Sequence, residues 1–221
     1  MEWRLLDGVP AEDARRVLSI ARRRTFGRGE VVFHQDDPAD SLHLIVEGRF
    51  AMQRPTALGE ETLLAIRGPG DAFGELALVS ERNRSATAAA LEPGETLCVH
   101  RHEFDELRRR HPSVDRMLVS LLAQQVERMN ELLSEAFYEN AEHRVLRRLL
   151  ELGQVYGADS AEPEIPLTQE KLASLAGTSR ATVNAVLAAE QRRGTIKLRR
   201  GVTVIRDAPA LARRAGLRPR R

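Results

Sequence analysis

Residues 167–187 read LTQEKLASLAGTSRATVNAVL, and this stretch decides the fold of the last third of the chain. Thr168 can cap a first helix, because its hydroxyl accepts from a backbone N–H that has no partner within the helix. Gly177 then allows a tight turn, and Thr178 or Ser179 can cap a second helix. We therefore expect two helices joined by a short turn.

These two helices, over residues 169–176 and about 180–191, carry apolar residues at positions that face each other across the turn. Ala173 is small enough for a close helix crossing. A hairpin follows, with strands TIKL and VTVI around the turn at residues 199–201. Two helices, a tight turn and a hairpin describe a winged helix-turn-helix. The residues expected to pack between the helices are Leu172, Leu175, Ala176, Val183, Val186 and Leu187.

The polar residues of this unit are of the kinds that contact DNA. In this motif the N-terminal end of the second helix enters the major groove. Arg180 lies there and can donate two parallel hydrogen bonds to guanine O6 and N7. Basic residues of the hairpin can contact the flanking phosphates. The candidate DNA contacts are Thr168, Gln169, Ser179, Arg180, Thr182, Asn184, Lys197, Arg199 and Arg200.

The basic charge of the chain is concentrated at the same end. Residues 141–221 contain 16 Lys and Arg against 8 Asp and Glu, whereas residues 1–140 contain 18 against 24. A near-neutral protein with one basic end indicates a polyanionic partner for that end. We interpret residues 213–221 alone as a solvated tail, whereas the arginines of residues 192–206 lie among strand-like residues.

The middle of the chain predicts a long helix. Residues 102–110 predict a short helix that ends before Pro112, and residues 113 to about 138 then contain neither Gly nor Pro. Apolar spacings of four and three give a heptad-like seam, so the helix can pack on its own domain and on a second copy. The seam residues are Leu118, Leu122, Gln125, Met129, Leu132 and Ala136.

The first 112 residues predict an all-β domain. Short alternating or β-branched runs, such as EVVFH and ETLCVHR, are separated by Gly, Pro and Asp turn signals. This spacing favours a sandwich or barrel over βαβ units. Helices are expected before the strands, within residues 5–9 and near 11–23, and after the long helix over 141–152, with a loop at 153–166.

Composition excludes several classes of protein. The chain is 42% hydrophobic and 30% charged, and no apolar run approaches the roughly 20 residues that span a bilayer. Residues 1–10 carry no secretion signal, so we expect a cytoplasmic protein without membrane contact. Cys98 is the single cysteine, which excludes an iron–sulfur cluster and an internal disulfide. We expect no enzyme and no bound metal, because no nucleophile–base set and no HExxH-type spacing occurs.

Residues 167–187 resemble the helix-turn-helix of the cyclic AMP receptor protein family, the CRP/FNR transcription regulators. The GxSRxTVxxxL core is present from Gly177 to Leu187, although Ala181 and Ala185 stand where relatives often carry Glu and Arg. The resemblance implies an α+β protein. It also implies a cyclic-nucleotide-binding β-roll (a jelly roll) over residues 1–112, a dimerisation helix over 113–140 and a winged helix-turn-helix over 141–221.

Residues 71–91, DAFGELALVSERNRSATAAAL, resemble the phosphate-binding cassette of cyclic-nucleotide-binding domains. Gly74 allows close approach of a backbone N–H, and Arg84 can pair with a cyclic phosphate through two hydrogen bonds. Ser85 can add a hydroxyl, and Glu75 can accept from a ribose 2′-hydroxyl. Leu76 completes the matching Gly-Glu-Leu.

In this family a pair of residues on the long helix contacts adenine across the dimer, and Met129 and Asn130 occupy that place here. Asn130 can hydrogen-bond a purine, so cyclic AMP is the first expectation and cyclic GMP stays open. The resemblance implies a homodimeric regulator that binds a palindromic operator and RNA polymerase under control of the nucleotide. Alternatives are a regulator with a vestigial site or another small effector, and a nucleotide-binding module that controls a partner enzyme.

Overall fold

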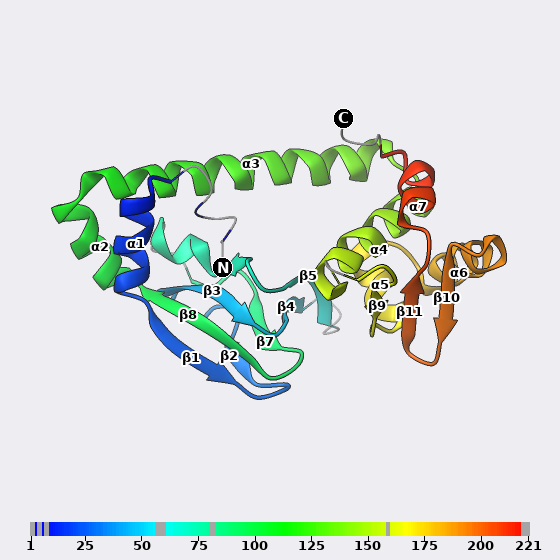
Figure 1. Ribbon diagram of the computed structural model, residues 1–221, viewed down its shortest axis with the longest axis horizontal. Coiled ribbons are helices and arrows are strands. Elements are labelled where there is room, and N and C mark those ends of the chain that lie inside the picture. The colour runs from blue at the N-terminus through cyan, green and yellow to red at the C-terminus, as the bar shows by residue number, and fades with distance from the viewer. Residues whose placement is uncertain are drawn as a thin grey trace. The chain divides into compact units, whose positions relative to one another are not determined.

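The computed structural model describes residues 3, 6, 9–55, 61–79, 83–157 and 160–217. The chain divides into two compact units, one within residues 1–55 and 65–130 and the other within residues 56–64 and 131–221. Figure 1 shows the first unit mainly in blue to green and the second mainly in yellow-green to red. In the described part of the chain, no helix is long and apolar enough to cross a bilayer.

The β part contains two antiparallel four-stranded sheets, in the orders β1-β8-β3-β6 and β2-β7-β4-β5. A core of Phe26, Ile45 and Phe73 from the first sheet meets Phe50 and Ala88 from the second. Burial of such side chains is the main driving force for closing the two sheets together. The strands are β1 Arg22–Phe26, β2 Val31–Phe33, β3 Ser41–Glu47, β4 Phe50–Pro55, β5 Glu61–Arg67, β6 Ala72–Phe73, β7 Thr87–Ala90 and β8 Gly94–His100.

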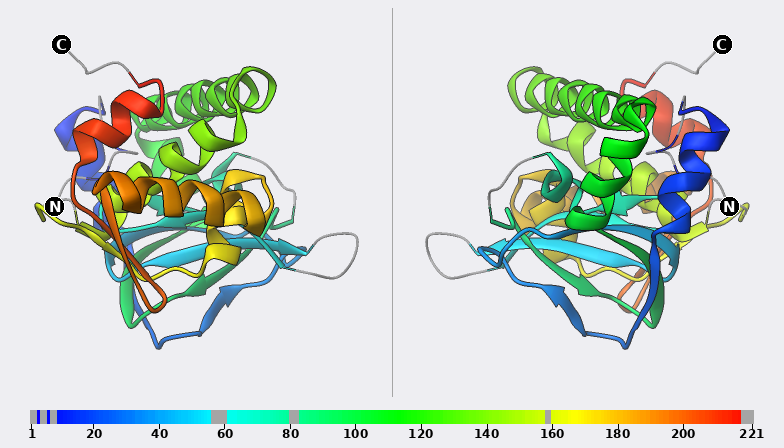
Figure 2. Two further views of the ribbon diagram at one scale, coloured as in Figure 1. Left: turned by 90° about the vertical axis from the view of Figure 1, so that its right-hand side faces the viewer. Right: turned by 90° about the vertical axis from the view of Figure 1, so that its left-hand side faces the viewer.

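Helices cover one end of this β part. Helices α1 (Ala11–Ser19) and α2 (Arg101–Arg110) pack against each other and against β8, as Figures 1 and 2 show. The short turn η3 (Pro112–Val114) leads into α3 (Asp115–Tyr138). A second core joins these helices to β3 through Val17, Leu42, Phe104, Met117 and Leu118. The first turns of α3 are thereby anchored to the β domain.

The expected helix over residues 11–23 is wrong in its last four residues. Helix α1 ends at Ser19, and Arg22 and Arg23 lie in β1, opposite Cys98 and Leu97 of β8. Four of the five β1 residues are exposed, so the alternating apolar pattern that marks a strand is missing there. The helix expected within residues 5–9 lies largely outside the described residues.

The second unit contains the expected helix-turn-helix and hairpin. Helix α4 continues past Leu152 to Gly157, so the loop expected from residue 153 is wrong. Gly153 is buried, and a Cβ there would lie 2.8 Å from the Ile205 side chain, so close packing explains the glycine. The elements are α4 Ala141–Gly157, β9 Glu164–Ile165, α5 Gln169–Ala176, α6 Arg180–Arg193, β10 Ile196–Arg199, β11 Val202–Ile205 and α7 Ala208–Arg214.

Helix α7 also corrects the expected solvated tail, because Arg213 and Arg214 lie within it. Arg214 Nε donates to the fully buried carboxylate of Glu190, 2.7 Å away, and its Nη2 pairs with Glu142. The hydroxyl of Thr195 donates to the same Glu190 carboxylate at 2.8 Å. Glu190 therefore ties α6, the start of the hairpin and α7 together. Residues 218–221 lie outside the described part.

Candidate DNA-binding and effector sites

The two helix caps position the DNA-reading end of α6. Thr168 accepts from Lys171 N at 3.3 Å and starts α5, and Gly177 ends α5 with a φ of 57°. Between Thr178 and Ser179, it is Ser179 that caps α6, accepting from the backbone N–H of Thr182 at 3.1 Å. The Ser179 and Thr182 hydroxyls also contact each other at 2.9 Å. Both residues therefore have a structural role at the start of α6.

The expected packing of α5 against α6 is present with one exception. Leu172 and Ala176 of α5 and Val183 and Leu187 of α6 are buried, as are Ala173 and Val186. Leu175 is instead partly exposed. The tight core fixes the direction in which α6 presents its N-terminal end, where Arg180 is exposed.

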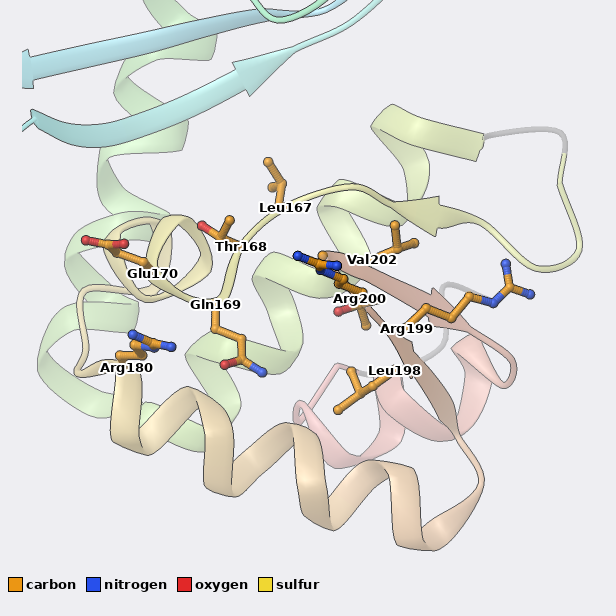
Figure 3. Close-up of a pocket in the computed structure, with 11 residues that line it drawn as sticks. Leu167, Thr168, Gln169, Glu170, Arg180, Leu198, Arg199, Arg200 and Val202 are labelled. Atoms are coloured by element: carbon orange, nitrogen blue, oxygen red, sulfur yellow. The ribbon is translucent and has the colours of Figure 1, made fainter.

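A pocket of about 430 Å³ lies between the starts of the two helices and the hairpin (Figure 3). Thr168 and Gln169 come from the α5 end, Arg180 is the first residue of α6, and Arg199 and Arg200 come from the hairpin. The structure therefore brings five of the nine candidate DNA contacts around one concave surface. Ser179, Thr182, Asn184 and Lys197 do not line it, although Asn184 lies one turn after Arg180 on α6.

The hairpin of β10 and β11 is part of a three-stranded sheet, because β9 pairs with β11 in the order β10-β11-β9. Lys197 and Arg199 alternate with the buried Ile196 and the partly buried Leu198 along β10. Arg199 pairs with Glu164 of β9 at 2.7 Å. Arg200 lies exposed in the turn. Arg199 and Arg200, the two arginines of the hairpin or wing, therefore differ in how far an acidic partner already compensates their charge.

The cassette residues build a compact site within the first unit. Gly74 follows β6 with a φ of 75°, and the 3-10 helix η2 (Glu75–Leu78) begins directly after it. A Cβ at Gly74 would lie 2.7 Å from Arg84 Nη1 and 3.0 Å from the Ser41 carbonyl oxygen. The left-handed backbone and the nearby Ser41 carbonyl therefore favour glycine here, and the Arg84 side chain fills the space that a Cβ would occupy.

Arg84 is 5% exposed and points into the domain. Its backbone is held by Asp36 and Asp37, with Asp36 N donating to Arg84 O at 2.9 Å and Arg84 N to Asp37 O at 2.8 Å. Its guanidinium lies 4.0 Å above the Phe33 ring. Burial lowers the pKa of Arg84, and the nearby Asp40 charge opposes that shift. The Arg84 side chain is thus a buried cation on a segment whose backbone is fixed by two hydrogen bonds.

Glu75 and Arg84 do not pair with each other in the described structure. Glu75 accepts a hydrogen bond from the Gln125 side chain of α3, whereas Arg84 uses Ser41, Asp40 and the Gly74 carbonyl. The other cassette residues are more accessible: Leu76 is 42% exposed and Ser85 is exposed. Asn130 is exposed on α3, and no hydrogen bond links it to Glu75 or Arg84 among the described residues.

Cys98 is fully buried, as an apolar role predicts. Its sulfur lies 3.9 Å from His43 Nε2 and 3.8 Å from His100 Nε2, and burial raises the pKa of the thiol. His43 stacks on Phe73 with ring centroids 5.0 Å apart. Burial and then the charge of Arg84 lower the pKa of His43 to about 3. In the part of the chain that the structure describes, no group of three His, Cys, Asp or Glu side chains is placed to hold a metal ion.

Two positions of the expected seam of α3 lie off its exposed face, whereas Leu122, Met129, Leu132 and Ala136 are exposed. Leu118 is 8% exposed in the core of its own domain, and Gln125 contacts Glu75, so these two positions face inward. Five of the exposed apolar positions follow spacings of three and four, as in a dimeric coiled coil. They are Val119, Leu122, Val126, Met129 and Leu133, at 66%, 46%, 57%, 60% and 51% exposure.

Sequence reasoning missed Ser41, Asp40, Phe33 and the role of Gln125. Asp40 directly precedes β3 and Ser41 is its first residue, far from the cassette in sequence, and nothing in their local pattern marks them. Gln125 carried a signal, because a polar residue interrupts an apolar seam there. A polar residue at such a position often has a specific partner.

This combination of a β domain with a Gly-Glu and Arg-Ser cassette, a long helix and a winged helix-turn-helix defines a transcription regulator with an effector domain. Residues 23–111 match the cyclic nucleotide-binding domain family, and residues 143–214 match the Crp-like helix-turn-helix domain family. The chain belongs to the cyclic AMP receptor protein (CRP/FNR) family of transcription regulators.

Its relatives agree over nearly the whole length. The chain is 35% identical over 207 residues to the cyclic AMP receptor protein of Thermus thermophilus, covering 94% of both chains. It is 34% identical over 193 residues to a CRP-like cAMP-activated global transcriptional regulator of Mycobacterium tuberculosis, covering 86% of both. The crystal structure of the Thermus thermophilus catabolite activator protein matches with a TM-score of 0.54 and 34% identity, over 97% of this chain and 99% of that one.

Proposed function

We propose that the protein is a homodimeric transcription regulator whose affinity for DNA is controlled by a cyclic nucleotide, cyclic AMP before cyclic GMP. The observation that carries this proposal is the convergence of Gly74, Glu75 and Arg84, with Glu75 bonded to Gln125 of α3. The carboxylate that would accept from the ribose is thus linked to the helix that presents an apolar face, and it directly follows the glycine on which Arg84 packs. Two relatives that are 34% and 35% identical carry cyclic AMP in their names, which supports that nucleotide.

In this proposal Arg84 binds the cyclic phosphate, with Ser85 and the backbone at Gly74 and Leu76 completing the phosphate site. Glu75 accepts from the ribose 2′-hydroxyl and thereby favours ribose over deoxyribose. Asn130 hydrogen-bonds the base from α3. Residues 1–112 act as the effector domain, 113–140 as the dimerisation helix and 141–221 as the DNA-binding domain.

The dimer forms through the exposed apolar face of α3, because single soluble chains rarely leave such a face in water. It places two α6 helices in successive major grooves, ~34 Å apart, on a palindrome. Arg180 and Asn184 read bases there, and Thr168, Gln169, Ser179, Thr182, Lys197, Arg199 and Arg200 hold the backbone or add base contacts. The nucleotide shifts the equilibrium between two dimer states by its differential affinity for them. RNA polymerase is the further partner.

Calorimetric titration of the dimer with cyclic AMP, and separately with cyclic GMP, tests the effector assignment. We expect saturable binding of at least one of them, stronger for cyclic AMP, and loss of binding in Arg84→Ala with the fold and dimer intact. Absence of heat with both nucleotides at millimolar concentration, while specific DNA binding persists, would favour a vestigial site or another effector.

A further inference from the structure

The guanidinium of Arg84 is already saturated by its own chain. Nη1 donates to the Ser41 carbonyl at 2.7 Å and to the Gly74 carbonyl at 3.3 Å. Nη2 donates to the Ser41 hydroxyl at 2.9 Å and to Asp40 Oδ1 at 3.1 Å. Each Nη carries two hydrogens, so these four contacts use all of them.

One donor of Arg84 stays without a partner. The Nε atom is buried and makes no hydrogen bond within the described structure. A phosphate that approached this conformation would find a single free N–H, whereas a bidentate contact needs two. Binding of an anion by Arg84 therefore requires that at least one of the present acceptors give way.

Asp40 is the acceptor that can leave most readily. Its side chain is 67% exposed, whereas the Ser41 carbonyl belongs to strand β3 and the Gly74 carbonyl starts η2. Water can solvate a released Asp40 carboxylate, but a buried carbonyl left without a donor is costly. Asp40 is also the single formal anion among the four acceptors, so it competes with a phosphate for the same charge.

We propose that Asp40 is an intramolecular competitor for the phosphate of the effector, and that it sets the nucleotide affinity by holding Arg84 in a self-bonded conformation. The Ser41 hydroxyl supports it, donating to Asp40 Oδ1 at 2.8 Å while it accepts from Arg84. Asp40 acts through Arg84 and is therefore a positioning residue. This inference rests on the proposed function of the cassette.

The competition has a kinetic signature. The nucleotide has to displace Asp40 before Arg84 can form a bidentate contact, so the self-bonded state slows association. Asp40→Asn removes the charge but keeps the size of the side chain, and should release Arg84. Because Asp40 is exposed, its substitution should leave the fold intact, and thermal unfolding of each variant against the wild type checks this.

The test measures binding of a fluorescent cyclic AMP analogue to the full-length dimer by stopped flow, in wild type, Asp40→Asn and Asp36→Asn. Asp36→Asn is the matched control, because Asp36 is an exposed aspartate in the same connection between β2 and β3, and its side chain contacts Gln35 rather than Arg84. We expect Asp40→Asn to bind roughly tenfold more tightly, as expected for loss of a partly exposed charged hydrogen bond. The gain should lie mainly in the association rate. Asp36→Asn should match the wild type, and Asp40→Ala should act like Asp40→Asn.

Weaker or unchanged binding by Asp40→Asn would overturn the inference, and weaker binding would mean that Asp40 orients Arg84 for the ligand. Equal tightening by Asp36→Asn would overturn it as well, because the effect would then be one of general charge. If wild type and all variants fail to bind the analogue, cyclic AMP and cyclic GMP, the proposed function itself fails and the competition with it. If instead the wild type binds and Asp40→Asn shows no gain, the inference about Asp40 fails while the proposed function stands.

Discussion

The side-chain amide of Gln125 on α3 donates a hydrogen bond to the carboxylate of Glu75 at the start of η2. This contact joins the candidate ribose acceptor directly to the long helix. A carboxylate offers about four acceptor positions, so Glu75 can hold Gln125 and a ribose hydroxyl together. We therefore expect a change in one partner of Glu75 to affect the other.

We predict that Gln125→Ala binds cyclic AMP about three- to tenfold more weakly, since Glu75 loses the donor that orients it, a loss of about 1 kcal/mol. The variant should also show a smaller gain in DNA affinity on addition of cyclic AMP. Calorimetry and DNA-binding anisotropy measure the two effects. Glu127→Ala, at an exposed position on the same helix, serves as the control. Wild-type behaviour of Gln125→Ala in both assays would show that the contact transmits nothing.

Val126→Glu should convert the dimer to monomer. Val126 is 57% exposed at the middle of the apolar face of α3, and two copies would bring like charges together where apolar packing is expected. Light scattering after size-exclusion chromatography gives the mass directly. Ser134→Glu adds the same charge at an exposed position off this face and should stay dimeric. A monomeric wild type, or a dimeric Val126→Glu, would argue against this interface.

The two wing arginines should differ in the salt dependence of DNA binding. Arg199 is paired with Glu164 at 2.7 Å, so its charge is partly compensated before DNA arrives, whereas Arg200 is exposed in the turn. Each phosphate contact contributes about 0.9 to the slope of log K against log salt concentration. Arg200→Ala should lower that slope by about 0.9 per DNA-binding domain, and Arg199→Ala by less. Equal slopes for wild type and Arg200→Ala would remove Arg200 from the interface.

His43 should make the protein less stable in mild acid. Its pKa is lowered to about 3 in the folded protein, so between pH 6.5 and 3 the unfolded chain binds a proton that the folded chain does not. Stability contributed by neutral His43 is therefore complete above pH 6.5 and is lost as the pH falls. From pH 7.5 to 5 the loss is about 2 kcal/mol. Urea unfolding of wild type and His43→Gln at both pH values isolates this loss, which the variant should not show.

The order of elements was predictable from the sequence where local chemistry is strong. The Thr168 and Ser179 caps and the left-handed Gly177 define α5 and α6 in the structure as they do in the sequence. The short helix that begins after Gly74 was also predictable, whereas the ligand contacts of the cassette stay a prediction. These features depend on neighbouring residues, which a single sequence displays.

Features that depend on distant partners were not predictable. β1 is polar because it lies exposed at a sheet edge. Its partner strand β8 lies about seventy residues further along the chain. Helix α7 is held by Glu190 and Glu142, which no local pattern links to Arg214. The hydrogen-bond partners of Arg84 and of Gln125 are likewise distant in sequence, so no local pattern indicates them. The sequence could not tell which apolar residues of α3 face its own domain, because Leu118 and Val119 are both apolar and only Leu118 is buried.

The measurement that tests the account most directly is the affinity for a selected genomic operator with and without cyclic AMP. We predict that cyclic AMP raises the wild-type affinity by roughly 5- to 150-fold, the usual range of allosteric coupling. Arg84→Ala should not respond. Arg180→Ala should lose about 1–3 kcal/mol of specific binding, and Arg192→Ala, at the far end of α6, should not. Equal wild-type affinity with and without millimolar cyclic AMP and cyclic GMP would contradict control of DNA binding by a cyclic nucleotide.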